Sequence, residues 1–213
     1  MTTEKSAPRE QLALALRVHP EPIVVRDPFL EFLGLVAPEE PVAVSFDELV
    51  KAAGHMCPTV AGAYLVLRHG LKALYGDEPA VRGNVRVTAY GGPTDFGYGP
   101  MSQLVNVAIG AAPETGFGGL GAGRFRRRDL FVFRSDDLRH CEFDFERLDT
   151  GRTVHVTYEP NVVPASKDLA AAIGPALSNG DPASVARFRS LWNTRVEDIL
   201  EADARVVRVE AVR

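Results

Sequence analysis

The strongest helical pattern in the chain lies between residues 58 and 75, where apolar side chains recur three and four positions apart. This spacing places Val60, Tyr64, Leu67, Leu71 and Leu74 on one face of a predicted helix. Small residues at positions 61–63 allow another backbone segment to approach that helix closely. A second segment, residues 101–111, is apolar almost all round, which predicts a buried helix.

Short stretches rich in β-branched and aromatic residues are predicted strands. They cover residues 23–25, 84–90, 129–134, 141–145 and 153–158, and a closing strand is expected over 205–212. Asp181 and Pro182 form a cap and first-turn pair that opens a long helix near the C-terminus. A preceding Ala-rich helix, residues 166–177, is expected to be interrupted by Gly174 and Pro175.

The N-terminal third has weaker patterns, and we expect an arm that packs on the main domain. A helix is predicted over residues 29–35, and the segment around Pro38 and Pro41 has the composition of a connector. The chain has 213 residues, of which 46% are hydrophobic and 24% charged, values ordinary for a globular protein. That length allows one sizeable domain with an appendage.

The charge balance and the absence of long apolar runs exclude several classes of protein. A formal net charge of −4 argues against nucleic acid or an anionic membrane as a partner. No apolar run approaches the roughly 20 residues that a membrane span needs. The N-terminus lacks the apolar core of a signal peptide, so we expect a cytoplasmic protein. The two cysteines form no CxxC pair, which excludes a disulfide framework and a ribbon-type zinc module.

The candidate chemistry lies in the segment Gly54-His55-Met56-Cys57-Pro58. Ser45 and Glu48 have the spacing of a capping box that opens a short helix, and Gly54 suits its left-handed end. Pro58 suits the first position of the next helix, which makes Cys57 its N-cap residue. A thiol there faces unpaired N–H groups and the positive helix end, which favour the thiolate. His55 brings an imidazole to the same place; the alternative is a buried structural cysteine beside a structural histidine.

A glycine-rich loop and an arginine run are the second candidate. The glycines of residues 115–124 permit close backbone approach to a ligand or an anion nest, with Gly118, Gly119, Gly121 and Arg124 as the binding residues. The alternative is a loop that packs on its neighbours. Arginines at positions 124 and 126–128 form either a solvated strand entrance or a site for a carboxylate or phosphate, which would suit an anionic small molecule. We interpret His69 as solvated and His155 as structural.

Residues 46–158 resemble the FmdE-like family, which takes its name from the E subunit of formylmethanofuran dehydrogenase. The resemblance rests on Gly54-His55-Met56-Cys57-Pro58, the small-residue helix after it, and the later Thr-Gly loop. It implies an α+β fold with an α-β-α-β-β-β core and a mixed sheet, similar to the catalytic domain of glyceraldehyde-3-phosphate dehydrogenases. The core would cover residues 45–160, with an arm at 1–44 and a helix-strand extension at 161–213. It also implies a metal, most often zinc, at His55 and Cys57, and a homodimer.

The chain departs from the family pattern at two places. Thr59 follows Pro58 where the family has glycine, and Phe117 occupies the place of a loop cysteine. Further metal ligands would have to come from elsewhere, with Asp95, His140 and Cys141 as the candidates. Two alternatives stay open: a metal-free protein that uses Cys57 as nucleophile or sulfur carrier with His55 as base, and a module that binds a large cofactor such as haem.

Overall fold

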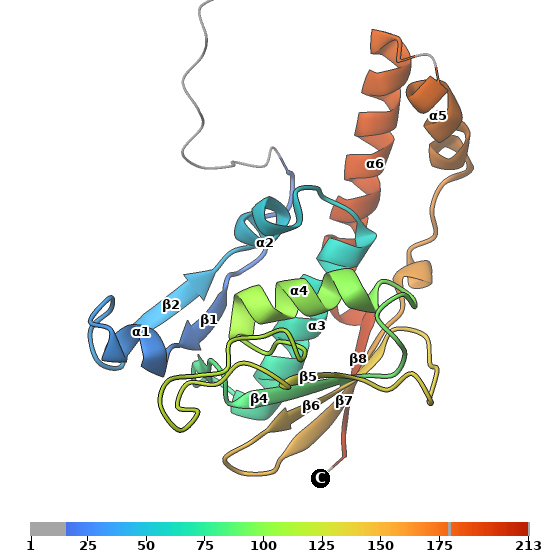
Figure 1. Cartoon of the computed structure of the whole chain (residues 1–213). Coiled ribbons are helices and arrows are strands. Elements are labelled where there is room, and N and C mark those ends of the chain that lie inside the picture. The colour runs from blue at the N-terminus through green and yellow to red at the C-terminus, as the bar shows by residue number, and fades with distance from the viewer. Residues whose placement is uncertain (1–15, 179, 213) are drawn as a thin grey trace, which may run out of the picture.

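The computed structural model describes residues 16–178 and 180–212, so the first fifteen residues of the predicted arm lie outside the described residues. Two sheets and six helices make up this part of the chain (Figure 1). The larger sheet has the strand order β5-β4-β6-β7-β8 and the smaller one β2-β1-β3. The strands are β1 (Ile23–Arg26), β2 (Pro41–Val44), β3 (Ala80–Val81), β4 (Val85–Ala89), β5 (Phe131–Phe133), β6 (Glu142–Arg147), β7 (Thr153–Tyr158) and β8 (Val207–Ala211).

The helices alternate with these strands in the order that the resemblance implies. They are α1 (Pro28–Phe32), α2 (Phe46–Ala53), α3 (Pro58–Tyr75), α4 (Tyr98–Ile109), α5 (Lys167–Ser178) and α6 (Pro182–Ala202). From α3 to β7 the longer elements follow as α-β-α-β-β-β. In the larger sheet β4 and β5 are parallel and the other neighbours antiparallel. The predicted α+β class with a mixed sheet is therefore confirmed.

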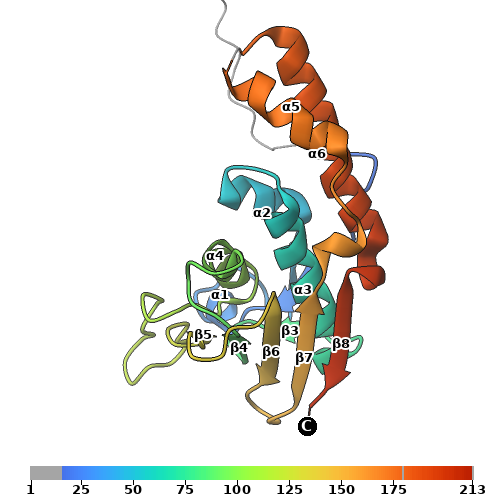
Figure 2. The ribbon, with the colours of Figure 1, turned by 90° about the vertical axis from the view of Figure 1, so that its right-hand side faces the viewer.

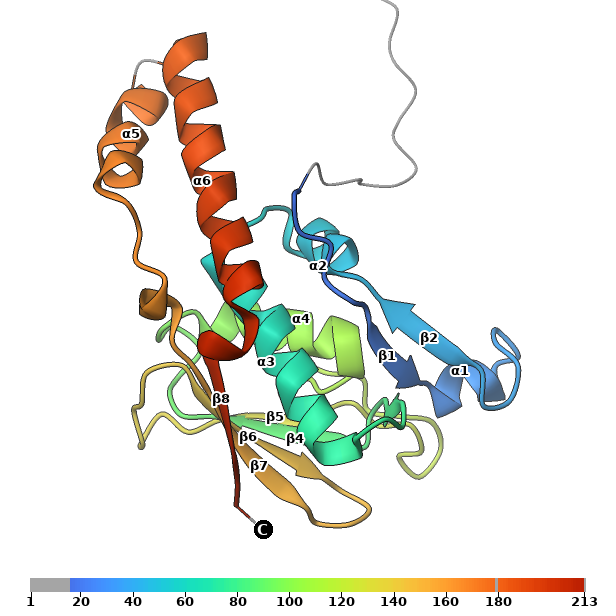
Figure 3. The same cartoon turned by 180° about the vertical axis from the view of Figure 1, so that it is seen from behind.

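Helix α3 covers one face of the larger sheet, as the view from behind shows (Figure 3). Its glycines allow the close approach: a Cβ at Gly62 would overlap the ring of Tyr158, and one at Gly70 would lie 3.2 Å from the ring of Phe145. Phe143 and Phe145 of β6 are fully buried on this face, while the residues that alternate with them along the strand are only half-buried. This alternation is the expected consequence of a sheet with one covered and one open face.

The N-terminal arm contains a strand that the sequence analysis missed. Residues 41–44, expected as part of a connector, form β2 and pair antiparallel with β1. Pro41 is the first residue of this edge strand, a position at which proline is tolerated. The connector was predicted because Pro38 and two glutamates, which are typical of loops, directly precede the strand.

A buried ion pair joins the arm to the main body. Arg127 Nη2 donates to Asp27 Oδ1 at 2.9 Å, and Arg82 Nη1 donates to Asp27 Oδ2 at 3.2 Å. Arg127 was predicted as part of a solvated entrance or an anion site; only 8% of the residue is exposed. The carboxylate that it binds belongs to the chain itself, which corrects the solvated interpretation.

The C-terminal part forms a helical hairpin that stands away from the sheets (Figure 2). Asp181 caps α6, as predicted, and accepts hydrogen bonds from the N–H groups of Ala183 and Ser184. Helix α5 continues through Pro175 instead of being interrupted, with Leu169 and Ala172 buried. At the foot of α6, His69 Nε2 and Asp203 Oδ1 lie 2.7 Å apart, so His69 is not the solvated residue we predicted.

Candidate functional site

The turn between α2 and α3 is formed by the capping and helix-end residues that the sequence predicts. The Ser45 N–H donates to Glu48 Oε2 at 2.7 Å and the Glu48 N–H donates to Ser45 Oγ at 3.2 Å, so the capping box is complete. Gly54 ends α2 with a left-handed φ of 72°, and Pro58 is the first residue of α3. Cys57 is therefore the N-cap residue. Its side chain makes no capping hydrogen bond, which leaves the sulfur without a partner on the helix end.

His55 and Cys57 line one cavity of about 240 Å³ between α2, α3 and α4. His55 is exposed and Cys57 is half-buried. The other lining residues are Ala53, Thr59, Val60, Pro100, Gln103 and Leu104. The structure thus brings the predicted imidazole and thiol to the same opening, where a small molecule has access to both.

A backbone carbonyl fixes the orientation and tautomer of His55. Its Nδ1 lies 3.0 Å from the carbonyl oxygen of Ala53, which only accepts hydrogen bonds. Nδ1 therefore carries the hydrogen, and in the neutral ring Nε2 holds the lone pair. This arrangement is common among metal-bound histidines, whose second nitrogen donates to a carbonyl or carboxylate.

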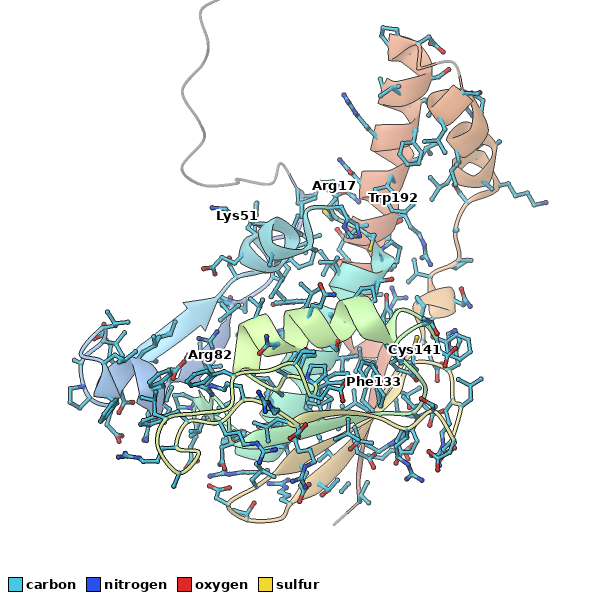
Figure 4. The ribbon with its side chains drawn as sticks, viewed as in Figure 1. Arg17, Lys51, Arg82, Phe133, Cys141 and Trp192 are labelled. Atoms are coloured by element: carbon cyan, nitrogen blue, oxygen red, sulfur yellow. The ribbon has the colours of Figure 1, made fainter. Side chains whose placement is uncertain are left out.

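Two side chains from distant elements hold the turn in place. Trp192 of α6 donates from Nε1 to the Met56 carbonyl at 2.6 Å, and Tyr158 of β7 donates to the Pro58 carbonyl at 2.8 Å. Figure 4 shows Trp192 on the stretch of α6 beside this turn. Burial raises the pKa of the Tyr158 phenol well above its usual range, although the Arg195 guanidinium partly opposes this rise. The phenol therefore keeps its hydrogen and its bond to Pro58.

The three further candidate ligands do not join His55 and Cys57. Within residues 16–178 and 180–212, no group of three or more His, Cys, Asp or Glu side chains is placed to hold a metal ion. Asp95 instead accepts a hydrogen bond from the Gly92 N–H at 2.8 Å, and His140 packs against the ring of Phe96 at 4.7 Å. Cys141 belongs to the hydrophobic core, where burial raises its pKa to about 11. The described residues therefore do not support these three as ligands: Asp95 accepts a backbone hydrogen bond, Cys141 is buried in the core, and none of them completes a group of three with His55 and Cys57.

The chemistry of His55 and Cys57 suits a soft or borderline metal ion, but two protein ligands are fewer than zinc sites have. Thiolate sulfur and neutral imidazole nitrogen are the ligands that zinc prefers. Catalytic zinc sites have three protein ligands and structural ones four. An ion held by His55 and Cys57 would need its other positions filled by water or by a ligand in the cavity.

The second glycine-rich loop lies against the arm and away from this cavity. Phe117 and Phe125 stack on Phe29 of α1 with ring centroids 5.5 and 4.8 Å apart, and the Arg124 guanidinium lies 4.8 Å from the centre of the Phe125 ring. The cavity lining does not include Gly118, Gly119, Gly121 or Arg124. Their role in cofactor binding stays a prediction, while the packing interpretation of this loop agrees with its contacts.

Sequence reasoning missed two residues of the site, Gln103 and Trp192. Gln103 is exposed on α4 and lines the cavity. A signal for Gln103 was present in the sequence: Gln103 and Asn106 are polar residues three positions apart in a largely apolar helix, which places both on one open face. For Trp192, no local pattern in the sequence indicates the acceptor of its N–H.

Comparison with known proteins gives a distant structural relation. No protein-family model matches the chain, and neither does any curated protein. The crystal structure of a Syntrophus aciditrophicus protein, described as similar to the E subunit (FmdE) of tungsten formylmethanofuran dehydrogenase, aligns over 79% of this chain and 72% of that one, with 14% identity and a TM-score of 0.43. Membership of the FmdE-like family and the homodimer stay predictions. No helix in the described part of the chain combines the length and apolarity needed to cross a bilayer.

Proposed function

We propose that His55 and Cys57 bind a zinc-like ion at the mouth of α3 and that a small molecule occupies the adjoining cavity. The observation that carries this proposal is that both residues line one cavity, with no hydrogen-bond partner for His55 Nε2 among the described residues. The backbone carbonyl of Ala53 keeps Nδ1 protonated, so Nε2 is the nitrogen available for an ion. When bound, such an ion polarises a carbonyl group or activates water.

The chain's own residues would hold this site rigid. Trp192 and Tyr158 fix the carbonyls on either side of Cys57, which limits movement of the sulfur relative to α3. Val60 and Leu104 are buried and give the cavity an apolar floor. A rigid, partly apolar setting strengthens the interaction of a charged group with a bound ligand.

Metal analysis of the full chain tests the proposal. We expect one zinc ion per chain by elemental analysis, and its loss in both Cys57→Ser and His55→Ala. The matched control is His140→Ala, which removes an exposed histidine that lies outside the cavity. Retention of zinc in Cys57→Ser, or equal loss in His140→Ala, would contradict the assignment.

A second candidate is a metal-free thiol site, favoured by the lack of a third protein ligand among the described residues. In that case Cys57 is the nucleophile and His55 Nε2 accepts its proton. The purified chain would then hold no zinc, and Cys57 would be alkylated faster in the parent than in His55→Ala. Haem is the least suitable ligand, because a cavity of about 240 Å³ is smaller than typical pockets for drug-sized molecules.

A further inference from the structure

A second cavity lies on the other side of Gln103. Its volume is about 420 Å³, and it shares Gln103 and Leu104 with the His55–Cys57 cavity. Neighbouring residues of α2 also connect the two, since Ala52 lines the second cavity and Ala53 the first. Its far side is formed by Val107 of α4, Thr115 and Gly116 of the glycine-rich loop, and Phe133 of β5. Figure 4 shows Phe133 below α4, on the side of the loops.

The described residues that line these two cavities include no aspartate, glutamate, lysine or arginine. This is a local property, because 24% of the chain is charged. A third cavity, of about 440 Å³ between β1 and α3, is lined by Arg68, Lys72, Asp77 and Glu78 among others. Transfer of a charged group into a site without a counter-charge is costly, so the second cavity, whose lining does not include His55 or Cys57, selects against charged groups.

Two side-chain amides provide hydrogen bonds in this uncharged setting. Gln103 and Asn106 are exposed on α4, and their amide groups make no hydrogen bond within the described residues. Ser102, which also lines the second cavity, instead donates to the Gly99 carbonyl at 2.7 Å. Each free amide offers two donors and one acceptor oxygen to a ligand.

We infer that the two cavities bind a single elongated, uncharged small molecule with polar groups along its length. One end reaches Cys57, and the rest passes Gln103 and lies along α4 towards Val107 and Thr115. This inference rests on the proposed function for its reactive end and names the class of ligand. It replaces the anionic ligand that the arginine run suggested, because Arg124 lines neither cavity.

Alkylation of Cys57 with a set of maleimides tests the inference on the full chain after treatment with a chelator. The probes are N-methylmaleimide, N-hexylmaleimide and maleimidohexanoate, which differ in tail length and in charge at the tail end. Each rate at Cys57, measured by peptide mass mapping, is divided by the rate of the same probe with glutathione. We expect the hexyl probe to react about tenfold faster than the methyl probe, because its tail enters the second cavity. The carboxylate probe should lose most of that gain.

Substitutions in the second cavity separate this inference from the proposed function. Val107→Arg and the nearly isosteric Asn106→Asp should each remove most of the hexyl advantage and leave the methyl rate unchanged. Val132→Arg is the matched control, since Val132 is 36% exposed, close to the 39% of Val107, and lines neither cavity. Equal normalised rates for the methyl and hexyl probes, or a hexyl advantage that survives both substitutions, would overturn the inference. Zinc binding by the parent chain would be unaffected by that result.

Discussion

Two histidines of this protein, His55 and His155, lie in opposite kinds of polar surroundings. His155 of β7 has Nδ1 2.7 Å from Asp144 Oδ1 and Nε2 3.1 Å from Glu142 Oε2, so both ring nitrogens have partners. The Tyr90 hydroxyl donates to Asp144 at 2.6 Å and extends this cluster on the open face of the sheet. Among the described residues, the His55 ring has one hydrogen-bond partner, a carbonyl two residues away, and His55 lines a cavity.

The difference shows how a polar cluster that stabilises the fold is distinguished from one that can bind. Each ring nitrogen of His155 faces a carboxylate oxygen of the chain itself, one from Asp144 and one from Glu142. No atom of that ring is left for a ligand, and the cavities described above do not include it. His55 contributes little to the hydrogen bonding within the fold, and its ring is available to bind a ligand. The following predictions test this contrast, beginning with the largest effect.

The largest expected effect is on zinc affinity. His55→Ala should weaken zinc binding at least about a hundredfold, since replacement of a residue that merely orients a ligand already costs about 10–100-fold. His155→Ala should leave the affinity within about threefold. Competition with a chromophoric chelator measures both values. A similar loss in the two variants would remove the distinction between the histidines.

Stability should respond in the reverse order. His155→Ala leaves Asp144 and Glu142 without their shared hydrogen-bond partner, and we expect the free energy of unfolding to fall by about 1–3 kcal/mol. His55→Ala removes an exposed ring and should change it by less than about 0.5 kcal/mol. Urea unfolding followed by circular dichroism gives both numbers. Equal destabilisation would mean that His55 is as structural as His155.

A smaller effect on stability and zinc affinity is expected from Trp192, whose N–H donates to the carbonyl of Met56, the residue after His55. Trp192→Phe keeps most of the ring and removes the N–H that donates to Met56, which should cost about 1 kcal/mol of stability. Zinc affinity should fall several-fold as the turn loosens. Phe188→Leu is the control on the same helix, because the Phe188 ring packs against Trp192 in a tilted pair with centroids 5.5 Å apart but makes no such hydrogen bond. An unchanged affinity in Trp192→Phe would show that the turn holds its geometry without α6.

The smallest expected effect is on the acid dependence of stability, and it concerns a second internal cluster, the buried Asp27 with Arg82 and Arg127. Burial alone raises the pKa of Asp27, but Arg127, the Phe29 N–H and Arg82 outweigh it and hold the pKa below the ordinary carboxyl value. The carboxylate therefore adds stability that is complete above the ordinary pKa of about 3.9 and is lost as the pH falls towards the folded value. In Asp27→Asn this part of the acid dependence should disappear.

Urea midpoints measured between about pH 5 and pH 2 check this expectation. The control is Asp136→Asn, whose side chain is 80% exposed and 3.9 Å from Arg134. The Asp27→Asn midpoint should change less with pH than those of the parent and the control. An Asp27→Asn profile parallel to that of the parent would contradict the assigned role of Asp27.

Local patterns were sufficient for most of the backbone. The capping box at Ser45, the glycine at position 54 and the proline at position 58 are short-range signals, and they fixed the ends of two helices and the N-cap place of Cys57. Errors arose where packing outweighed a local signal. Pro41 opened an edge strand, and Pro175 remained inside a helix whose other residues pack on α6.

The sequence by itself determined that His55 and Cys57 meet at the start of α3, because both lie within three residues of Pro58 and the dihedral preferences of glycine and proline act over that range. Only the tertiary structure decided what surrounds them: the cavity shared with α4, the Trp192 donor 136 residues from its acceptor, and the diversion of Arg127 to Asp27, 100 residues away. Such partners depend on how whole helices and strands pack, and the sequence near each of these side chains does not indicate which residue it will contact.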